Sequence, residues 1–484
     1  MLTLLHTSDW HLGRRLYGKP RYDEFHAFLQ WQIRAIVDNR VDVLLIAGDI
    51  FDSSSPSNKA QQLYYQFLHA VKNTPCRHVV IVAGNHDSPS FLDAPNLLLK
   101  NFDIHVIGCV RENLDDEILV LYDNQDRPEC IVCAVPYLRD RDVRMVGYAE
   151  NLSDKENQLI AGIYAHYQAI SEQAFAKKQT LEARFQIPIP IVATGHLFTV
   201  GGQTLDGDGV RDLYVGSLGS VTADLFDTRY DYVALGHLHV AQTVGGNAFI
   251  RYSGSPIAMG FGEAKQQKQV NLVKFFANNF DPNDPADERN LPLLPLQKNL
   301  SSDRIFNHDL FDNDLLDNDL FGFDRADFDK QNNQQNLNKP YSLALINDSK
   351  KPIQTLIQSL AIPTFQTLIR IQGDLKYIET TIKTLKKSAR TAWLEVVYTG
   401  DDWVANLHEN MVNLTKDSHL EVLRTKNLQN RQQTLQANHA NEALDDLDEL
   451  AVFERCLSAY DVADSQKDGL RLRYRDILQS LQTE

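Results

Sequence analysis

Short groups of Asp, Asn and His residues recur along the first half of this 484-residue chain, and each follows an apolar run. In chain order they are Asp9-x-His11, Gly48-Asp49, Gly84-Asn85-His86-Asp87, Gly195-His196 and Gly236-His237-x-His239. Carboxylates, amide oxygens and imidazoles, with no thiolate, suit manganese, iron or zinc. Two such ions about 3.5–4 Å apart can stabilise both the attacking and the leaving oxygen of a phosphoryl centre. The motifs therefore predict a two-metal site for phosphoester hydrolysis.

The candidate ligands divide between two ions. Asp9 and His11 leave the same strand together and can reach one ion, and the two oxygens of Asp49 make it the natural bridge. The first ion is then expected to be bound by Asp9, His11, Asp49 and His239. The second is expected to be bound by Asp49, Asn85, His196 and His237. Each ion keeps open positions for water and a phosphate oxygen, as catalysis requires.

The remaining residues of these motifs have expected supporting roles. His86 adjoins the ligand Asn85, so it can donate a proton to the leaving oxygen or stabilise charge in the transition state. Asp87 is expected to orient His86 or a ligand from behind. A basic stretch after the first motif offers contacts to phosphates, although a solvated basic loop is the alternative. Its members are Arg14, Arg15, Lys19 and Arg21.

The elements that position these residues are expected to be strands of an α/β fold. The runs at 41–49 and 78–87 are nearly continuously apolar, which is typical of strands buried on both faces, and 190–196 and 231–239 are shorter versions. Helical spacing of apolar residues appears at 25–36 and 64–71. Ligand sites in open α/β sheets lie beyond the carboxyl ends of strands, and glycine lets the backbone turn there.

Composition and charge separate the chain into parts. The hydrophobic content of 43% is sufficient for a core, and the length predicts two or three domains. The net charge of −16 weighs weakly against nucleic acid, because thirteen acidic and six basic residues at 279–339 account for much of it. That stretch contains an imperfect five-residue repeat at 309–323, which predicts a mobile acidic linker or, alternatively, a segment that docks on a partner.

The rest of the chain is expected to fold again after this insert. We expect a metal-binding domain at 1–278, the acidic insert at 279–339, a small α+β domain at 340–430 and a helical tail at 431–484. The tail has leucine-rich stripes that fit either a hairpin closing on its own chain or a partner-binding module. Cys130 and Cys133 lie in a predicted strand and point to opposite faces, so we expect two core cysteines.

The amino terminus has no basic region followed by an apolar one, and no stretch reaches the length of a membrane helix. We therefore expect a soluble, cytoplasmic protein without a membrane partner.

These motifs resemble the pattern of the calcineurin-like metallophosphoesterase superfamily and, within it, the SbcD family of bacterial nuclease subunits. The resemblance covers residues 1–260, and Asp52 stands where some relatives carry histidine. The matching stretches are HTSDWHLGRRLYGKPRYDE, VAGNHDS, CAVPYLRDRD, IVATGHLFTVGG, VRDLYVGSL, DYVALGHLHVAQ and RYSGSPI.

The resemblance implies a two-sheet sandwich flanked by helices, followed by a capping domain. It implies Mn²⁺ as the preferred ion, ATP-dependent exonuclease activity on double-stranded DNA and endonuclease activity on single strands and hairpins, in repair and recombination. It also implies that the C-terminal helices bind an SbcC-type coiled-coil ATPase, and that a homodimer forms through helices near 57–72 and 90–100. It assigns no role to the acidic insert or to Asp52.

Two other classes of function remain open from the sequence. A small-molecule phosphodiesterase or phosphatase of the same superfamily would have an identical metal site, but it would not need a capping domain and a helical tail. A non-catalytic assembly subunit would keep the fold, and the intact ligand set argues against it.

Overall fold

The structure is a computed structural model. It describes residues 1–143, 152–199, 221–277, 343–346, 352–387 and 391–428, apart from 401, 403, 405 and a few side chains at segment ends, together with isolated positions in the tail. The acidic insert and nearly all of the predicted tail lie outside the described residues. The chain divides into two compact units, Met1–Ile369 and Arg370–Glu484.

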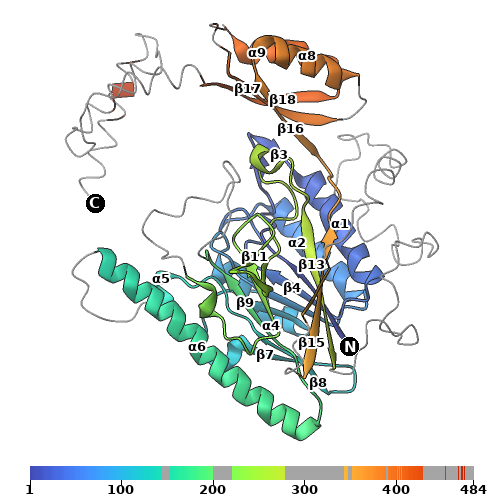
Figure 1. Ribbon diagram of the computed structural model, residues 1–484, viewed down its shortest axis with the longest axis vertical. Coiled ribbons are helices and arrows are strands. Elements are labelled where there is room, and N and C mark those ends of the chain that lie inside the picture. The colour runs from blue at the N-terminus through green and yellow to red at the C-terminus, as the bar shows by residue number, and fades with distance from the viewer. Residues whose placement is uncertain are drawn as a thin grey trace. The chain divides into compact units, whose positions relative to one another are not determined.

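The first unit is built on two sheets, as the family resemblance implied (Figure 1). The first sheet has the order β14 (Leu343–Ile346), β15 (Ile353–Ala361), β13 (Gln269–Ala277), β1 (Leu2–Thr7), β4 (Val43–Ala47), β5 (His78–Val82) and β6 (Ile104–Ile107). The second has the order β11 (Gln242–Val244), β12 (Asn247–Tyr252), β10 (Tyr232–Gly236), β9 (Ile191–His196), β8 (Pro128–Cys133) and β7 (Ile118–Tyr122). In the first sheet, parallel pairs join β1 to β4, β4 to β5 and β5 to β6. In the second sheet, they join β8 to β9, β9 to β10 and β10 to β12.

Apolar side chains alternate between two environments along the central strands, which is why their sequences are almost wholly apolar. In β4, Val43 and Leu45 pack between the two sheets, whereas Leu44 and Ile46 pack on the outer face. The two cysteines follow the same rule: Cys130 lies between the sheets and Cys133 belongs to the outer cluster of the second sheet. Both are buried and unpaired, which confirms the prediction of core cysteines.

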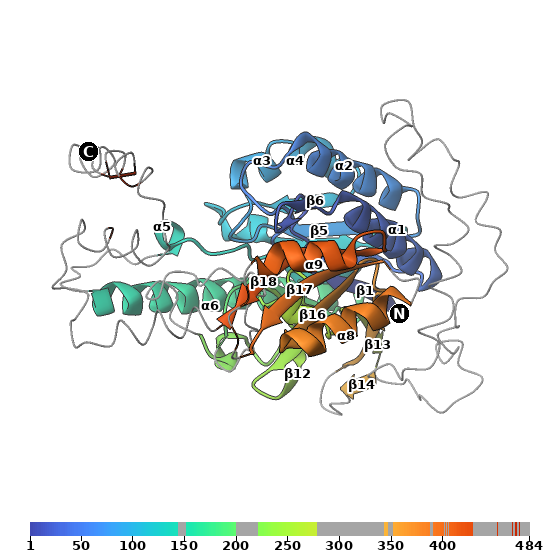
Figure 2. The same cartoon turned by 90° about the horizontal axis from the view of Figure 1, so that it is seen from above.

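Helices cover the outer faces of this sandwich. The first sheet is covered by α1 (Tyr22–Asp38) and α2 (Asn58–Lys72), and the short α3 (Pro89–Asp93) and α4 (Asn96–Lys100) lie beside β6. The second sheet carries α6 (Leu152–Phe185), a long helix whose apolar residues pack on that sheet's outer face. Figure 2 shows α2, α3 and α4 grouped on one side of the sandwich. The fold is therefore the predicted two-sheet sandwich flanked by helices.

One boundary differs from the sequence prediction. The sequence pattern places residues from 340 onward in the second domain, but β14 and β15 return to the first sheet. β15 pairs with β13 along its whole length, from Gln269 opposite Ala361 to Ala277 opposite Ile353. Without β15, the hydrogen-bonding groups on that side of β13 would form an open edge. The first unit therefore continues to Ile369.

The described part of the second unit is a small α+β structure. It contains the sheet order β16 (Thr367–Gly373), β17 (Ala392–Tyr398) and β18 (Leu420–Asn427), with helices α8 (Leu375–Lys386) and α9 (Leu407–Thr415). Helix α8 follows β16, and Asp374 caps it by accepting from Tyr377 N.

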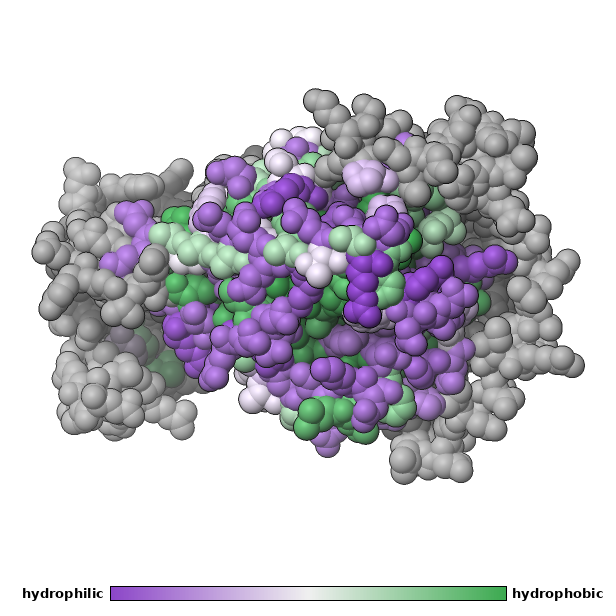
Figure 3. Space-filling model, turned by 90° about the horizontal axis from the view of Figure 1, so that it is seen from below, coloured by the Kyte–Doolittle hydropathy of each residue, from purple (hydrophilic) through white to green (hydrophobic). Residues whose placement is uncertain are grey.

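Three shorter features complete the description. Two-residue strands at Arg15–Leu16 and Lys19–Pro20 pair as a small hairpin after the first motif. Among the described residues, no helix is both long and apolar enough to cross a membrane. The face seen in Figure 3 is mostly polar, with smaller apolar areas between the polar side chains.

Candidate metal centre

The five sequence motifs meet at one place, beyond the carboxyl ends of strands from both sheets. Three motifs follow β1, β4 and β5 of the first sheet, and two lie at the ends of β9 and β10 of the second. Because parallel strands end at the same edge, each sheet brings its own motifs together, and the sandwich brings the two sets face to face. All the carboxylate and imidazole ligands predicted from the sequence are buried: Asp9, His11, Asp49, His196, His237 and His239.

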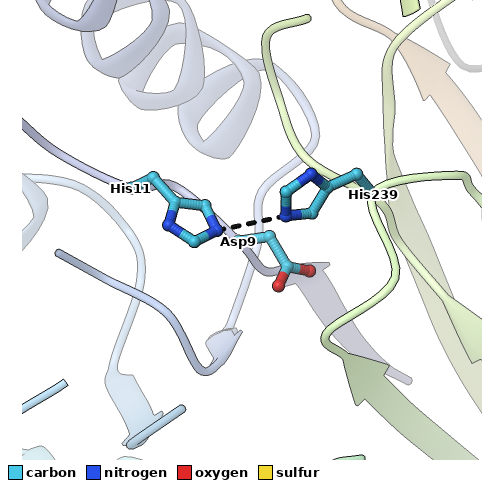
Figure 4. A group of neighbouring side chains, drawn as sticks. All are labelled: Asp9, His11 and His239. Atoms are coloured by element: carbon cyan, nitrogen blue, oxygen red, sulfur yellow. Dashed lines mark hydrogen bonds between the residues drawn. The ribbon is translucent and has the colours of Figure 1, made fainter. Parts of the chain in front are cut away.

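The first group contains Asp9, His11 and His239 (Figure 4), whose ligand atoms all lie within 4.8 Å of one another. The Nε2 atoms of the two histidines face each other at 3.1 Å. Asp9 accepts from the Ser8 hydroxyl at 2.5 Å and from His237 N at 2.9 Å, which fixes its carboxylate. This group therefore offers one carboxylate and two imidazoles to a common point.

The second group forms around Asp49 and Asn85. His196 Nε2 lies 3.3 Å from Asp49 Oδ2 and 3.1 Å from Asn85 Oδ1, and His237 Nδ1 lies 3.1 Å from the same amide oxygen. His11 Nε2 lies 3.6 Å from Asp49 Oδ2. Asp49 Oδ2 therefore lies near a histidine of each group.

The donor atoms of this cluster fit divalent ions. His196 Nδ1 donates to the Ala47 carbonyl at 2.9 Å, which leaves Nε2 as the nitrogen that faces Asp49 and Asn85. Burial lowers the pKa of His237 to about 3 and that of His11 well below its ordinary value, so both imidazoles are neutral. Metal ions bind imidazole in this neutral form. Several buried nitrogen and oxygen atoms of this cluster point their lone pairs at one another within hydrogen-bond distance. A shared cation would satisfy these lone pairs.

Left-handed backbone conformations occur at four of these residues. The φ angles are 54° at Asp9, 50° at His11, 52° at Asp49 and 104° at His237. Such angles are uncommon outside glycine, and they persist where the surrounding structure enforces them, often at functional sites. The sequence gives no sign of this strain, because none of the four is a glycine.

Glycines precede the ligands for two different reasons. Gly48 has a φ of +89°, which is the turning role expected from the sequence. Gly84 has no such angle, but a Cβ there would overlap the carboxylate and backbone of Asp49. At Gly84 the requirement is therefore close approach between two ligand-bearing loops rather than a special backbone angle.

His86 lies at the edge of the cluster, beside the ring of His11. Its backbone N donates to Asp49 Oδ1 at 2.8 Å, and its Nδ1 lies 2.9 Å from the carbonyl oxygen of Asp52. Because a carbonyl only accepts, Nδ1 carries the proton of that bond, and Nε2 is the nitrogen left for a substrate. This arrangement can exchange a proton or stabilise charge at Nε2.

Asp87 acts differently from the expectation that it would orient His86 or a ligand side chain. Its carboxylate accepts from the backbone N of Gly84 at 2.8 Å, of Phe51 at 3.0 Å and of Ile50 at 3.2 Å. It therefore joins the loop after β4 to the loop after β5. Burial, with a smaller contribution from Asp49, raises its pKa to about 6.

The basic residues near the first motif are only partly available. Arg14 is 18% exposed and donates to Asp52 Oδ1 at 3.0 Å, and Arg15 is exposed and donates to the Gly18 carbonyl. Arg21 is buried, where it donates to Glu24 and to the carbonyl of Ala258. The expectation that Arg21 could reach phosphates is therefore wrong, because its guanidinium is used inside the core.

Two acidic residues to which the sequence analysis gave no role contact this cluster. Asp52 lies with Oδ1 3.6 Å from His11 Nδ1 while also pairing with Arg14. Glu263 is fully buried, with Oε1 3.5 Å from His239 Nδ1. Burial opposes its ionisation, but Lys268 and His239 hold its pKa at about 2. The position of Asp52 after the Gly48-Asp49 motif was a signal in the sequence, whereas Glu263 follows no strand-end motif and is revealed only by the folded chain.

Comparison with known proteins agrees with this geometry. Residues 2–241 match the family model described as calcineurin-like phosphoesterase, and residues 364–460 match one described as type 5 capsule protein repressor C-terminal domain.

Relatives described as the D subunit of nuclease SbcCD align over the first part of the chain. The chain is 39% identical to the one from Escherichia coli K12 over 274 residues, which is 57% of this chain and 65% of the relative. It is 34% identical to the one from Bacillus subtilis over 275 residues, 56% of this chain and 66% of the relative. The alignments thus span slightly less than two thirds of each relative. All five motifs lie inside the stretch matched by the first model, and residues 2–241 form a domain of the calcineurin-like phosphoesterase family.

Proposed function

We propose that this chain is a Mn²⁺-dependent DNA nuclease subunit that works with an SbcC-type coiled-coil ATPase in DNA repair and recombination. The observation that carries the proposal is the convergence of five strand-end motifs on one buried cluster of carboxylates, imidazoles and an amide oxygen. The relatives that bear the SbcCD nuclease name supply the substrate class and the partner.

Two divalent ions are assigned to this cluster. The first is held by Asp9, His11, Asp49 and His239, and the second by Asp49, Asn85, His196 and His237. When bound, such ions polarise a phosphoryl oxygen and make a bound water nucleophilic near neutral pH. Asp49 Oδ2 lies near histidines of both groups, which supports its place between the ions.

The protein itself contributes position and proton transfer. His86 is held through Nδ1, so its Nε2 can donate to or stabilise the leaving oxygen of the cleaved phosphodiester. Asp87 keeps the two loops in register through three backbone bonds. Arg14 and Arg15 are the proposed contacts to DNA phosphates beyond the ions, since both retain some exposure.

The remaining parts of the chain are assigned to partners. Residues 370–427 are the proposed capping domain, and the C-terminal helices around 431–484 are the proposed docking segment for the ATPase. A cytoplasmic location follows from this function.

A homodimer is proposed through α2 and the short helices α3 and α4. Large apolar side chains are exposed there: Tyr65 at 37%, Leu97 at 86%, Leu98 at 61% and Phe102 at 45%. These residues lie on or directly after neighbouring helices of the first unit. A second copy would cover them and remove apolar surface from water.

The test is cleavage of a hairpin-ended DNA duplex by the purified chain with Mn²⁺, with and without the ATPase and ATP. Cutting that is stimulated by ATP is expected. Asp49→Asn is the matched inactive control, since it removes a charge from the bridging position while keeping the side-chain shape. A simple phosphodiester, assayed in parallel, reports on the metal site alone.

The outcomes distinguish an error in the proposed substrate from an error in the proposed metal site. Hydrolysis of the simple ester without any DNA cutting would overturn the nuclease assignment and favour a small-ester phosphodiesterase. If wild-type protein loaded with Mn²⁺ neither cuts DNA nor hydrolyses the simple ester, the two-metal assignment itself would be overturned.

A further inference from the structure

The segment between β12 and β13, residues 253–268, packs directly behind one half of the metal cluster. It begins within the RYSGSPI stretch and contains four buried residues with polar side chains: Ser253, Ser255, Glu263 and Lys268. The proposed function gives none of them a role. A segment this polar is costly to bury unless its groups are paired, so their partners indicate what it does.

At its start, the segment reaches Asp9. Ser253 Oγ lies 2.8 Å from Ser8 Oγ, and Ser8 Oγ donates to Asp9 Oδ2 at 2.5 Å. Gly254 has a φ of +76°, and a Cβ there would come within 2.8 Å of the His239 carbonyl oxygen. The backbone of the segment therefore lies against the strand end that carries His239.

At its end, the segment reaches the His239 ring. Glu263 Oε1 lies 3.5 Å from Nδ1 of this ring, and the opposite nitrogen, Nε2, faces His11 at 3.1 Å. Within the described part of the chain, Oε1 has no hydrogen-bond partner at the usual distance. A carboxylate behind a metal-binding imidazole fixes the ring and makes it a stronger donor.

Lys268 holds Glu263 in this position. Its Nζ pairs with Glu263 Oε2 and donates to the His239 carbonyl at 3.1 Å and to Ser255 Oγ at 2.9 Å. Met259 N also donates to Glu263 Oε2 at 3.1 Å. The carboxylate is therefore fixed on one oxygen by a buried ammonium group, while the other oxygen faces the imidazole.

The second ion position has no equivalent support among the described residues. The ring of His196 donates from Nδ1 to the backbone carbonyl of Ala47, which is a neutral acceptor. His237 Nδ1 faces the candidate ligand Asn85, and no described carboxylate forms an ion pair with this ring. The two halves of the cluster therefore differ in the charge that backs their imidazoles.

From this asymmetry we propose that Glu263, held by Lys268, is a positioning residue that makes the Asp9–His11–His239 position the tighter of the two ion positions. This inference rests on the proposed two-ion site, and it adds the order in which the two positions bind their ions. The Asp9–His11–His239 position fills first, and the position at Asn85, His196 and His237 fills at higher metal concentration.

The test is a titration of the full metal-free chain with Mn²⁺, in which free ion is followed by its electron paramagnetic resonance signal. Wild-type protein is expected to bind two ions with different affinities. In Glu263→Gln the tighter affinity should weaken by about 10–100-fold, as for other carboxylates behind metal-bound histidines. The weaker affinity should change less than about twofold, because no described group in that half contacts Glu263.

Glu24→Gln is the matched control. Glu24 is also a buried carboxylate paired with a cation, Arg21, and it lines the same small cavity as Glu263, but it contacts no candidate ligand among the described residues. This control should leave both affinities unchanged. Glu263→Asp, which keeps the charge, should recover part of the loss, and Lys268→Met should show the same selective weakening if Glu263→Gln does not fold.

The possible results distinguish failure of the two-ion site from failure of the positioning role of Glu263. Binding of fewer than two ions by wild-type protein would overturn the two-ion site. Two ions in wild-type protein with unchanged affinities in Glu263→Gln would overturn only the positioning role. Equal weakening of both ions, or a similar loss in Glu24→Gln, would show a general effect on folding and would also overturn it.

Discussion

His86 illustrates how much of a catalytic assignment depends on one hydrogen bond. Its Nδ1 bonds to a backbone carbonyl, that of Asp52, rather than to a carboxylate side chain. The carbonyl holds the ring in one orientation without adding a negative charge next to it. Nε2 is therefore the ring nitrogen that remains to exchange a proton with a substrate.

We predict that His86→Ala keeps both metal ions and lowers DNA cleavage by about 10²–10⁴-fold, the range for removal of a general acid or base. The ring contributes no atom to either proposed ion, and the backbone bond from its N to Asp49 does not need the side chain. Metal content by elemental analysis and the cleavage rate are the two measurements.

His408→Ala is the control, because that histidine is exposed on α9 in the other unit. It should change neither quantity. Loss of metal in His86→Ala would contradict the assigned role and would make His86 a ligand.

Strands determine this site more than helices do. Each motif lies where a strand ends, and the loops that follow are tied together by backbone bonds to Asp87 and by the close approach of Gly84 to Asp49. The helices instead cover the outer faces, and α4 leaves two leucines in solvent. A helix with such residues on its surface is typical of a contact between two protein molecules.

We predict that wild-type protein is a dimer in solution and that the double variant Leu97→Asp, Leu98→Asp is monomeric. Two carboxylates in the proposed interface would be buried without partners, which is strongly unfavourable. Both side chains are exposed in the single chain, so the fold should not change. Sedimentation velocity measures the molecular mass of each.

Tyr122→Asp provides the comparison, because Tyr122 is 41% exposed on β7 of the second sheet and belongs to none of the helices of the proposed interface. It should remain dimeric. A monomeric wild-type protein, or a double variant that stays dimeric, would remove this interface from consideration.

At the scale of the whole molecule, the metal cluster and the proposed partner-binding segments lie in different units. All candidate ligands belong to Met1–Ile369, whereas the proposed docking tail belongs to Arg370–Glu484. Chemistry at the cluster and attachment to an ATPase are therefore separable by truncation.

We predict that deleting residues 439–484 abolishes co-purification with the ATPase while Mn²⁺-dependent hydrolysis of a simple phosphodiester survives. The cluster described above is built without any of the deleted residues, so metal binding should persist. Pull-down with the ATPase and ester hydrolysis are measured on the same preparation. Undiminished co-purification would place the docking surface elsewhere, and loss of ester hydrolysis would show that the tail supports the first unit.

The sequence by itself determined the ligand types, their order and their place at strand ends. It could do so because residues such as Asp49 and His237 follow apolar strands directly, and local pattern suffices to locate a strand. It also determined that Cys130 and Cys133 lie on opposite faces of β8, because side chains alternate between the two faces along a strand.

Only the tertiary structure decided which distant residues support those ligands. Glu263 and His11 lie far apart in the chain, and they face opposite nitrogens of the His239 ring, which β10 brings to the same edge of the sandwich as the end of β1. Arg21 donates to the distant carbonyl of Ala258, and β15 covers the open edge of β13; no local periodicity encodes either partner. Pairings between elements far apart in sequence depend on which surfaces and edges remain to be covered once the strands have assembled.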